Sequence, residues 1–117
     1  METSENASQI SSEFVAAVER ARPAEETFKR LAGQWHTECL LFSSITEICT
    51  NMAYQQIIGM GAEALPFIFH ELQKEPDHWS WALQAITGEN PVPKNAAGDL
   101  EAMSSAWLEW ARQNRYL

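Results

Sequence analysis

The sequence predicts an all-α fold, a single small domain of five to seven helices. Apolar residues recur three and four positions apart along most of the chain, which is the spacing of one helical face. Glycines, prolines and capping residues divide the chain into short segments, and no segment of four or more residues alternates with the two-residue period of a strand. The 117 residues, of which 45% are hydrophobic, suit one globular domain with its own core.

We expect residues 1–8 to form a flexible tail and residues 9–117 to form the domain. The first predicted helix covers residues 9–22. Pro23 separates it from the next helix, because proline is tolerated in the first helical turn. The stripes expected to face the core are Ile10, Phe14, Val18 and Ala21 in the first helix, and Phe28, Leu31, Ala32 and Trp35 in the second.

The middle of the chain begins a new helix at a capping box. Ser44 can accept a hydrogen bond from the amide of Glu47, and the glutamate can reach back to the amide of the serine. A helix or a pair of helices follows and ends at Gly59 and Gly61, because glycine tolerates the left-handed conformation of many helix ends. The side chains available for burial here are Ile45, Ile48, Met52, Tyr54, Ile57 and Ile58.

Three further helices are predicted in the second half of the chain. One covers residues 62–75, with Pro66 in its first turn. Asp77 and Asp99 are the predicted N-caps of the other two, and the loop over residues 89–98 between them contains two prolines. The expected core stripes are Leu65, Ile68, Phe69 and Leu72, then Trp79, Ala82, Leu83 and Ile86, then Leu100, Met103, Trp107, Trp110 and Ala111.

Residues 54–88 contain a recognisable helical pattern. A helix ends at the glycines of 59–61, Ala64-Leu65-Pro66 opens the next helix, and Ala82-Leu83-Gln84-Ala85-Ile86 lies on another. This pattern resembles one HEAT-type repeat, and the phrases at 54–61 and 85–93 are similar to those of a group of small uncharacterised bacterial proteins. The resemblance implies a HEAT-like helical hairpin and a bacterial source. HEAT repeats stack in arrays, so divergent helices or another chain would have to cover this hairpin.

The charge of the chain limits the kinds of partner it can bind. Eight Lys and Arg residues stand against sixteen Asp and Glu residues, a net charge of −8, and no Lys or Arg occurs between Leu31 and Gln73. Nucleic acid is bound by neutralising its phosphates with basic residues. The sequence therefore argues against direct nucleic-acid binding and favours a basic protein as partner.

Other features of the sequence predict a cytoplasmic protein. The polar, acidic residues 1–8 do not form a signal peptide, and the longest apolar stretches, Cys39–Phe42 and Leu65–Phe69, are far shorter than a membrane span. Two cysteines are too few for a disulfide framework, which favours reduced thiols. No membrane partner is expected.

Few residues have the pattern of a chemical site. His36 and Cys39 share one helical face, but a structural zinc usually needs four ligands, and no second pair stands nearby. We therefore expect no metal and no cofactor. A small hydrolase-type enzyme remains an alternative, and its only candidate groups are His36, Cys39, His70 and His78.

The tryptophans suggest an interface. Trp79 and Trp81 are two positions apart, about 200° around a helix, so one core face cannot take both. Exposed tryptophan is enriched at binding hot spots. We expect one of the two to lie near an acidic patch formed by Glu38, Glu47, Glu63 and Glu71.

These observations predict a non-enzymatic, acidic protein-binding module. An antitoxin, an immunity protein or an adaptor of a bacterium would suit its size and charge. A self-associating structural module, in which the interface meets a second copy, is the other alternative.

Overall fold

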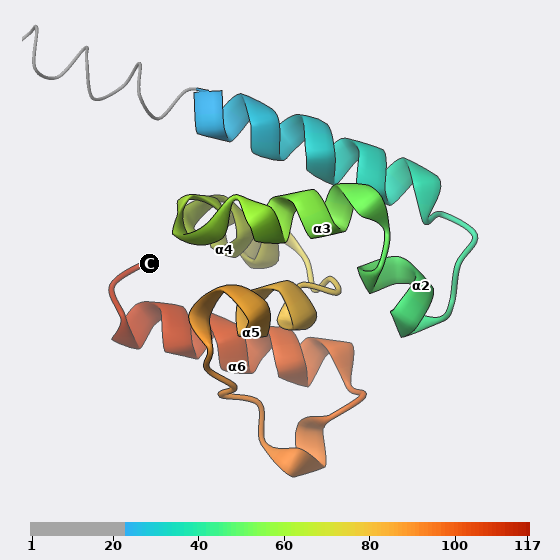
Figure 1. Ribbon diagram of the computed structural model, residues 1–117. Helices are drawn as coiled ribbons and strands as arrows, with labels where there is room; N and C mark the ends of the chain where they lie inside the picture. The colour runs from blue at the N-terminus through green and yellow to red at the C-terminus, as the bar shows by residue number, and fades with distance from the viewer. Residues whose placement is uncertain (1–22) are drawn as a thin grey trace, which may run out of the picture.

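Six α-helices form most of the chain that the computed structural model describes, which is residues 23–117 (Figure 1). They cover residues 23–38, α2 (Ile45–Cys49), α3 (Met52–Gly59), α4 (Leu65–Lys74), α5 (Ser80–Thr87) and α6 (Leu100–Gln113). Two short 3-10 helices are η1 (Gly61–Ala64) and η2 (Lys94–Ala96), the second within the predicted 89–98 loop. No strand occurs in residues 23–117, so the all-α prediction is confirmed. The predicted tail over 1–8 and helix over 9–22 lie outside the described residues.

The helices pack around α5. This helix contacts α3 on one side and α6 on the other, and α4 packs against α6. Figure 1 shows the 23–38 helix beside α3, at the side of the molecule opposite to α6. The long connection between α5 and α6 carries η2 and extends from the rest of the fold (Figure 1).

An aromatic core joins the 23–38 helix, α3 and the start of α5. The ring of Trp79 lies 4.7 Å from that of Trp35, 5.6 Å from that of Phe28 and 5.9 Å from that of Tyr54, measured between centroids. All four side chains are buried. The indole N–H of Trp35 donates to the carbonyl of Ile48 at 2.9 Å, which ties α2 to this core.

Several local signals define the helix ends as expected. The hydroxyl of Ser44 accepts from the amide of Glu47 at 3.5 Å, and the carboxylate of Asp99 accepts from the amide of Ala102 at 3.1 Å. Gly88 ends α5 with a φ of +72°, a conformation that costs glycine little.

The predicted N-cap at Asp77 is wrong. Helix α5 begins at Ser80, and its amide at Ala82 donates to the hydroxyl of Tyr54 at 2.8 Å. Asp77 instead contacts the imidazole of His36 at 2.6 Å and accepts from the amide of His78 at 2.8 Å. A tyrosine on α3 therefore satisfies the free amide that a capping residue of α5 would have satisfied.

The predicted core stripes agree with the structure in some helices and differ in others. The four side chains predicted in the 23–38 helix and the four predicted in α4 are all buried. Ile45 and Met52, expected in the core, are exposed. The side chain of Asn51 accepts a hydrogen bond from the amide of Ala53 at 2.9 Å and caps a separate helix, α3. Helix α2 is therefore short. Ile45 and Met52 do not share the core face of one continuous helix. The side chains that are only partly buried are Ile58, Ile86, Leu100, Met103 and Trp110.

Candidate functional site

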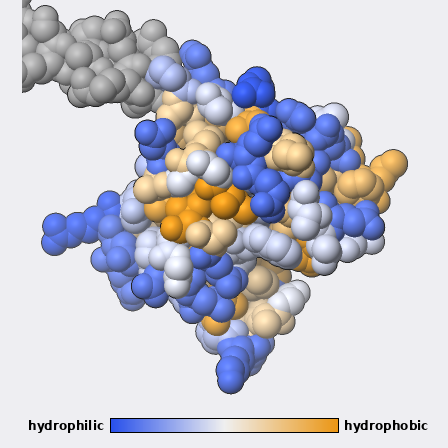
Figure 2. Space-filling view, viewed as in Figure 1, coloured by the Kyte–Doolittle hydropathy of each residue, from blue (hydrophilic) through white to orange (hydrophobic). Residues whose placement is uncertain are grey.

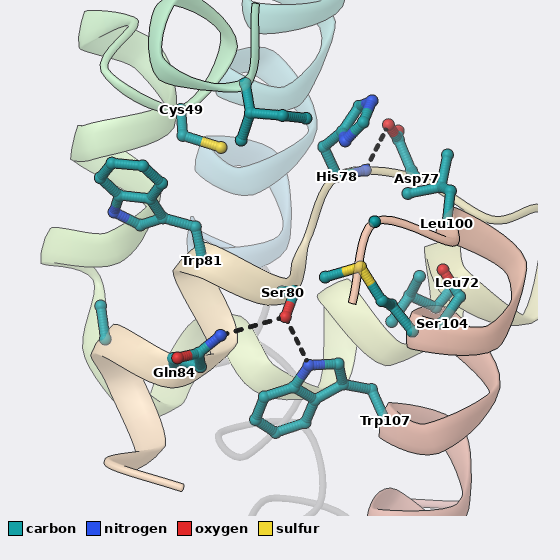
Figure 3. Close-up of a pocket in the computed structure, with 14 residues that line it drawn as sticks. Cys49, Leu72, Asp77, His78, Ser80, Trp81, Gln84, Leu100, Ser104 and Trp107 are labelled. Carbon is teal, nitrogen blue, oxygen red and sulfur yellow. Dashed lines mark hydrogen bonds between the residues drawn. The ribbon is translucent and has the colours of Figure 1, made fainter. Parts of the chain in front are cut away.

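A cavity of about 610 Å³ lies between α2, α5 and α6 (Figure 3). One wall of α5 residues comprises Trp81, Gln84 and Ala85, spaced i, i+3 and i+4. The α6 residues that line the cavity have the same helical spacing. Its residues are Leu100, Met103, Ser104 and Trp107. Most of the cavity surface is therefore formed by two helical faces that do not pack fully against each other.

The polar groups of the cavity are mostly engaged with one another. The hydroxyl of Ser80 accepts from the indole N–H of Trp107 at 3.0 Å and from the amide of Gln84 at 3.3 Å (Figure 3). Asp77 is held by His36 and by the His78 amide. The hydroxyl of Ser104, by contrast, is buried and finds no hydrogen-bond partner within residues 23–117.

The two tryptophans that the sequence singles out lie in different environments. Trp79 is 0% exposed and belongs to the aromatic core. Trp81 is 41% exposed and lies at the cavity, on the same side as Cys49 (Figure 3). Trp81 is thus the member of the pair that a partner can reach, and Trp79 is not available as an anchor.

A second apolar feature adjoins the cavity. Leu40, Leu41, Phe42, Ile45 and Met52 are five of the eight large hydrophobic side chains that are exposed in residues 23–117, and we call them the 40–52 strip. Leu41 is 97% exposed. Ile45 also lines the cavity, so the strip meets the cavity at this residue. Figure 2 shows hydrophobic atoms protruding at the side of the molecule where the chain turns between the 23–38 helix and α2.

The four predicted acidic residues lie on four different helical elements. Glu38 precedes the strip and accepts from the side-chain amide of Asn51 at 3.1 Å, and Glu47 is exposed on α2 within the strip. Glu63 lies on η1 and Glu71 on α4, and neither lines the cavity. Glu71 has a local counter-charge, because it pairs at 3.4 Å with Lys74, just beyond the stretch without Lys or Arg.

The candidate catalytic groups are dispersed. His36 is bound to Asp77, and this hydrogen bond raises the pKa of its imidazole. Burial raises the pKa of the Cys39 thiol, with Glu38 and Glu47 adding to the effect, and burial also raises the pKa of the Cys49 thiol. Raised thiol pKa values are the opposite of what a nucleophilic cysteine needs.

The two remaining histidines are not paired with a thiol. His70 is exposed on α4, whereas His78 is half-buried at the cavity. In the part of the chain that the structure covers, no group of three or more His, Cys, Asp and Glu side chains could hold a metal ion.

Sequence reasoning missed the strip and the cavity. The run Cys39–Phe42 is apolar but has no helical periodicity. Its position between two predicted helices was the signal that could have predicted the strip. Leu100 and Met103 have the spacing of core residues but line the cavity instead. The spacing of Leu100 and Met103 does not distinguish a residue that is buried in the core from one that lines the cavity.

The chain matches no family model, no curated protein and no solved structure. The similarity of residues 54–88 to a HEAT-type repeat therefore stays a prediction. Of the helices in residues 23–117, none has the length and apolar character needed to cross a membrane.

Proposed function

We propose that this protein is a non-enzymatic binding module whose 40–52 strip, together with Trp81, docks the apolar face of a basic partner protein. The observation that carries the proposal is the concentration of exposed large hydrophobic side chains in 13 consecutive residues beside an exposed tryptophan. Contiguous exposed apolar surface is uncommon on monomeric soluble proteins and marks interaction sites. Trp81 supplies the kind of side chain that dominates binding energy.

Charge complementarity supports a basic partner. Glu38 lies just before the 40–52 strip, and Glu47 lies within it. No Lys or Arg occurs from residue 32 to residue 72. The carboxylate of Glu38 is exposed apart from hydrogen bonds with side-chain amides. Acidic groups at the rim of an apolar patch attract a basic partner and set the association rate, while the apolar centre supplies most of the affinity.

The alternatives have less support. An enzyme using Cys39 or Cys49 would need a lowered thiol pKa, and burial raises both. Self-association would bring Glu38 and Glu47 of two copies toward one another, which costs free energy at low salt. The acidity of the chain and the resemblance to bacterial proteins that its sequence predicts favour an accessory role in the cytoplasm, as an antitoxin, immunity protein or adaptor.

A pair of synthetic peptides tests the chemistry of the proposed partner. The first is an amphipathic helix with leucine and tryptophan on one face and lysine on the other, and the second replaces every lysine by glutamate. We expect the basic peptide to bind and the acidic peptide not to bind, measured by fluorescence anisotropy at low salt. Affinity for the basic peptide should fall as salt is added, because rim charges are screened.

Two variants locate the binding surface. Leu41→Ser and Trp81→Ala should each weaken binding of the basic peptide about tenfold or more, because truncating a hot-spot residue costs about 2 kcal/mol or more. Leu117→Ser removes another exposed leucine, one that lies outside the strip, and should leave binding unchanged. Circular dichroism checks that each variant remains helical.

Three results would overturn the proposal. These are equal binding of both peptides, unchanged binding by Leu41→Ser and Trp81→Ala, or a dimer in sedimentation velocity that Leu41→Ser dissociates. The last result would assign the strip to contacts between copies of this chain.

A further inference from the structure

The apolar stripe of α6 is covered over only part of its length. Trp107 and Ala111 are buried, whereas Leu100 and Met103 are partly buried and line the cavity. The stripe of an amphipathic helix is normally covered by another element of the fold. The first half of this stripe therefore faces space that the described chain does not fill.

The opposite wall of the cavity comes from α5 and is also a helical face. Trp81 and Ala85 lie four positions apart on this face, and both are exposed. The indole N–H of Trp107 donates to the hydroxyl of Ser80 at 3.0 Å, which joins α6 to the start of α5. Figure 3 shows Trp81 on one side of this bond and Leu100 on the other. The cavity is therefore a trough between two helical faces, and it opens to the surface.

The dimensions of the cavity suit two turns of a helix. The lining residues of α6 extend from Leu100 to Trp107, so this wall is about 10 Å long at a rise of about 1.5 Å per residue. Side chains at positions i, i+4 and i+7 of an incoming helix cover the same length. The volume of about 610 Å³ lies within the range of roughly 300–1,000 Å³ that accommodates whole small ligands. The cavity therefore has room for more than one such side chain.

A β-strand of a partner would find less to bind here. Strand addition needs the free edge of a sheet, whose main-chain groups hold the incoming strand. Residues 23–117 contain no strand and offer no such edge. A helix satisfies its own main-chain hydrogen bonds and needs only an apolar groove for its side chains.

The charges around the cavity favour a basic helix. Among the described residues that line it, none is Lys or Arg. Asp99 and Glu101, on either side of Leu100 in the chain, are exposed and place two carboxylates at this end of α6. Lys94 is the one base in the connection between α5 and α6. Lysines on the solvent side of a bound helix would therefore meet more acidic than basic groups.

We infer that the partner inserts a basic, amphipathic α-helix into the cavity, with its apolar side chains at i, i+4 and i+7 lying between Trp81 and Leu100. This inference rests on the proposed function, because it concerns the same partner. It adds the form of the partner's docking element and the place where its side chains are buried. The 40–52 strip meets the cavity at Ile45, so the two surfaces can serve one partner.

Methionine methyl groups report on the strip and on the cavity separately. Met52 belongs to the 40–52 strip, Met103 lines the cavity, and Met60 belongs to neither. The full wild-type chain, isotope-labelled at its methionine methyl groups, is titrated with the basic amphipathic peptide and followed by nuclear magnetic resonance. We expect the signals of Met52 and Met103 to shift and the signal of Met60 to stay in place.

A second peptide of identical composition tests whether the docking element is a helix. Its leucines and tryptophan alternate with lysines, which spreads the apolar residues around a helix instead of gathering them on one face. We expect this peptide to bind about tenfold or more weakly than the amphipathic peptide, because it cannot place all its anchors in the cavity at once.

Two tryptophan substitutions test the place of insertion. Ala85→Trp fills part of the cavity and should weaken binding of the amphipathic peptide about tenfold or more, because the new ring occupies the space of an anchor. Ala62→Trp makes the same change at another exposed alanine, which lies on η1 outside the cavity, and should leave binding unchanged. Circular dichroism checks that both variants remain helical.

The outcomes separate this inference from the proposed function. If the peptide shifts Met52 but not Met103, or if Ala85→Trp binds it as wild type does, the partner docks on the strip without entering the cavity. The inference then fails and the proposed function stands. Equal binding of the two peptides would also overturn the inference, because the docking element would not need to be a helix. If the amphipathic peptide does not bind wild type, both fail. The Met103 signal is read in wild type, so the test does not depend on the folding of a variant.

Discussion

Trp79 and Trp81 occupy one turn of the chain but belong to two different regions of the molecule. The aromatic core around Trp79 surrounds its indole with the rings of Phe28, Trp35 and Tyr54. The cavity region gives Trp81 one open side. The same residue type therefore serves as a structural centre in one region and as an accessible wall in the other. Trp79 directly precedes α5 and has helical backbone angles, so a rotation of about 200° separates it from Trp81.

Each of the two regions contains one buried polar atom that is unpaired in the described part of the chain. The indole N–H of Trp79 and the hydroxyl of Ser104 are both buried and without a hydrogen-bond partner in residues 23–117. Trp79 is closely surrounded by aromatic rings, so no additional molecule can reach its N–H. The hydroxyl of Ser104 is equally inaccessible, although this residue is one of those that line the cavity. In both regions the unpaired group is a cost of packing.

The largest expected effect concerns the two tryptophans themselves. Trp79→Ala should lower the free energy of unfolding by about 3–5 kcal/mol, because it leaves a large hole in a well-packed core. Trp81→Ala should lower it by about 1 kcal/mol or less, since a partly exposed side chain has less buried area to lose. Urea unfolding followed by circular dichroism measures both. Equal losses would show that the cavity wall is as tightly packed as the core.

The next effect tests the link between the two regions. The hydroxyl of Tyr54 donates to the carbonyl of His78 and accepts from the amide of Ala82, each at 2.8 Å. Tyr54→Phe should cost about 1–3 kcal/mol of stability, because it leaves buried backbone groups without partners. Tyr116→Phe, at a more exposed tyrosine, is the matched control and should cost far less. A loss no greater than that of the control would mean that the hydroxyl is not needed for the junction.

The smallest effect is a pH dependence at the edge of the cavity. The hydrogen bond to Asp77 raises the pKa of His36, with Glu71 and Glu75 adding to it and burial opposing it. A raised folded-state pKa stabilises the fold below the ordinary value of about 6.5, and this contribution disappears as pH rises through the folded-state pKa. We expect less than about 1 kcal/mol, because His36 is half-exposed and solvent weakens the pair.

The measurement compares wild type with His36→Gln by urea unfolding at several pH values from about 6 to about 8. The stability advantage of wild type should shrink as pH rises through this range. A constant difference between the two proteins would show that the His36–Asp77 pair does not contribute through its charge.

Local signals in the sequence predicted a large part of the fold. Ser44 and Asp99 cap helices by contacts with amides three residues away, so the sequence around each of them was sufficient. The actual capping group of α5 lies 28 residues from the amide it binds, and Asp77 finds His36 across 41 residues. Such pairings depend on how the helices pack, which no local pattern reports.

The candidate site was harder to predict than the fold. The spacing of Trp79 and Trp81 was sufficient to expect that they face different directions, but it did not show which of them faces the core. Leu100 and Met103 fit a core stripe as well as Trp107 does. An apolar stripe is covered when the opposite helix packs close to it. The segments that connect the helices set this distance, and the sequence of the stripe does not report it.

The hydroxyl of Tyr54 has a consequence for how the molecule opens. Because it satisfies the third amide of α5, this helix loses that bond whenever α3 moves away. The wall that carries Trp81 is thus coupled to the centre of the protein and does not fray separately. We therefore expect hydrogen exchange at the amide of Ala82 to follow global unfolding.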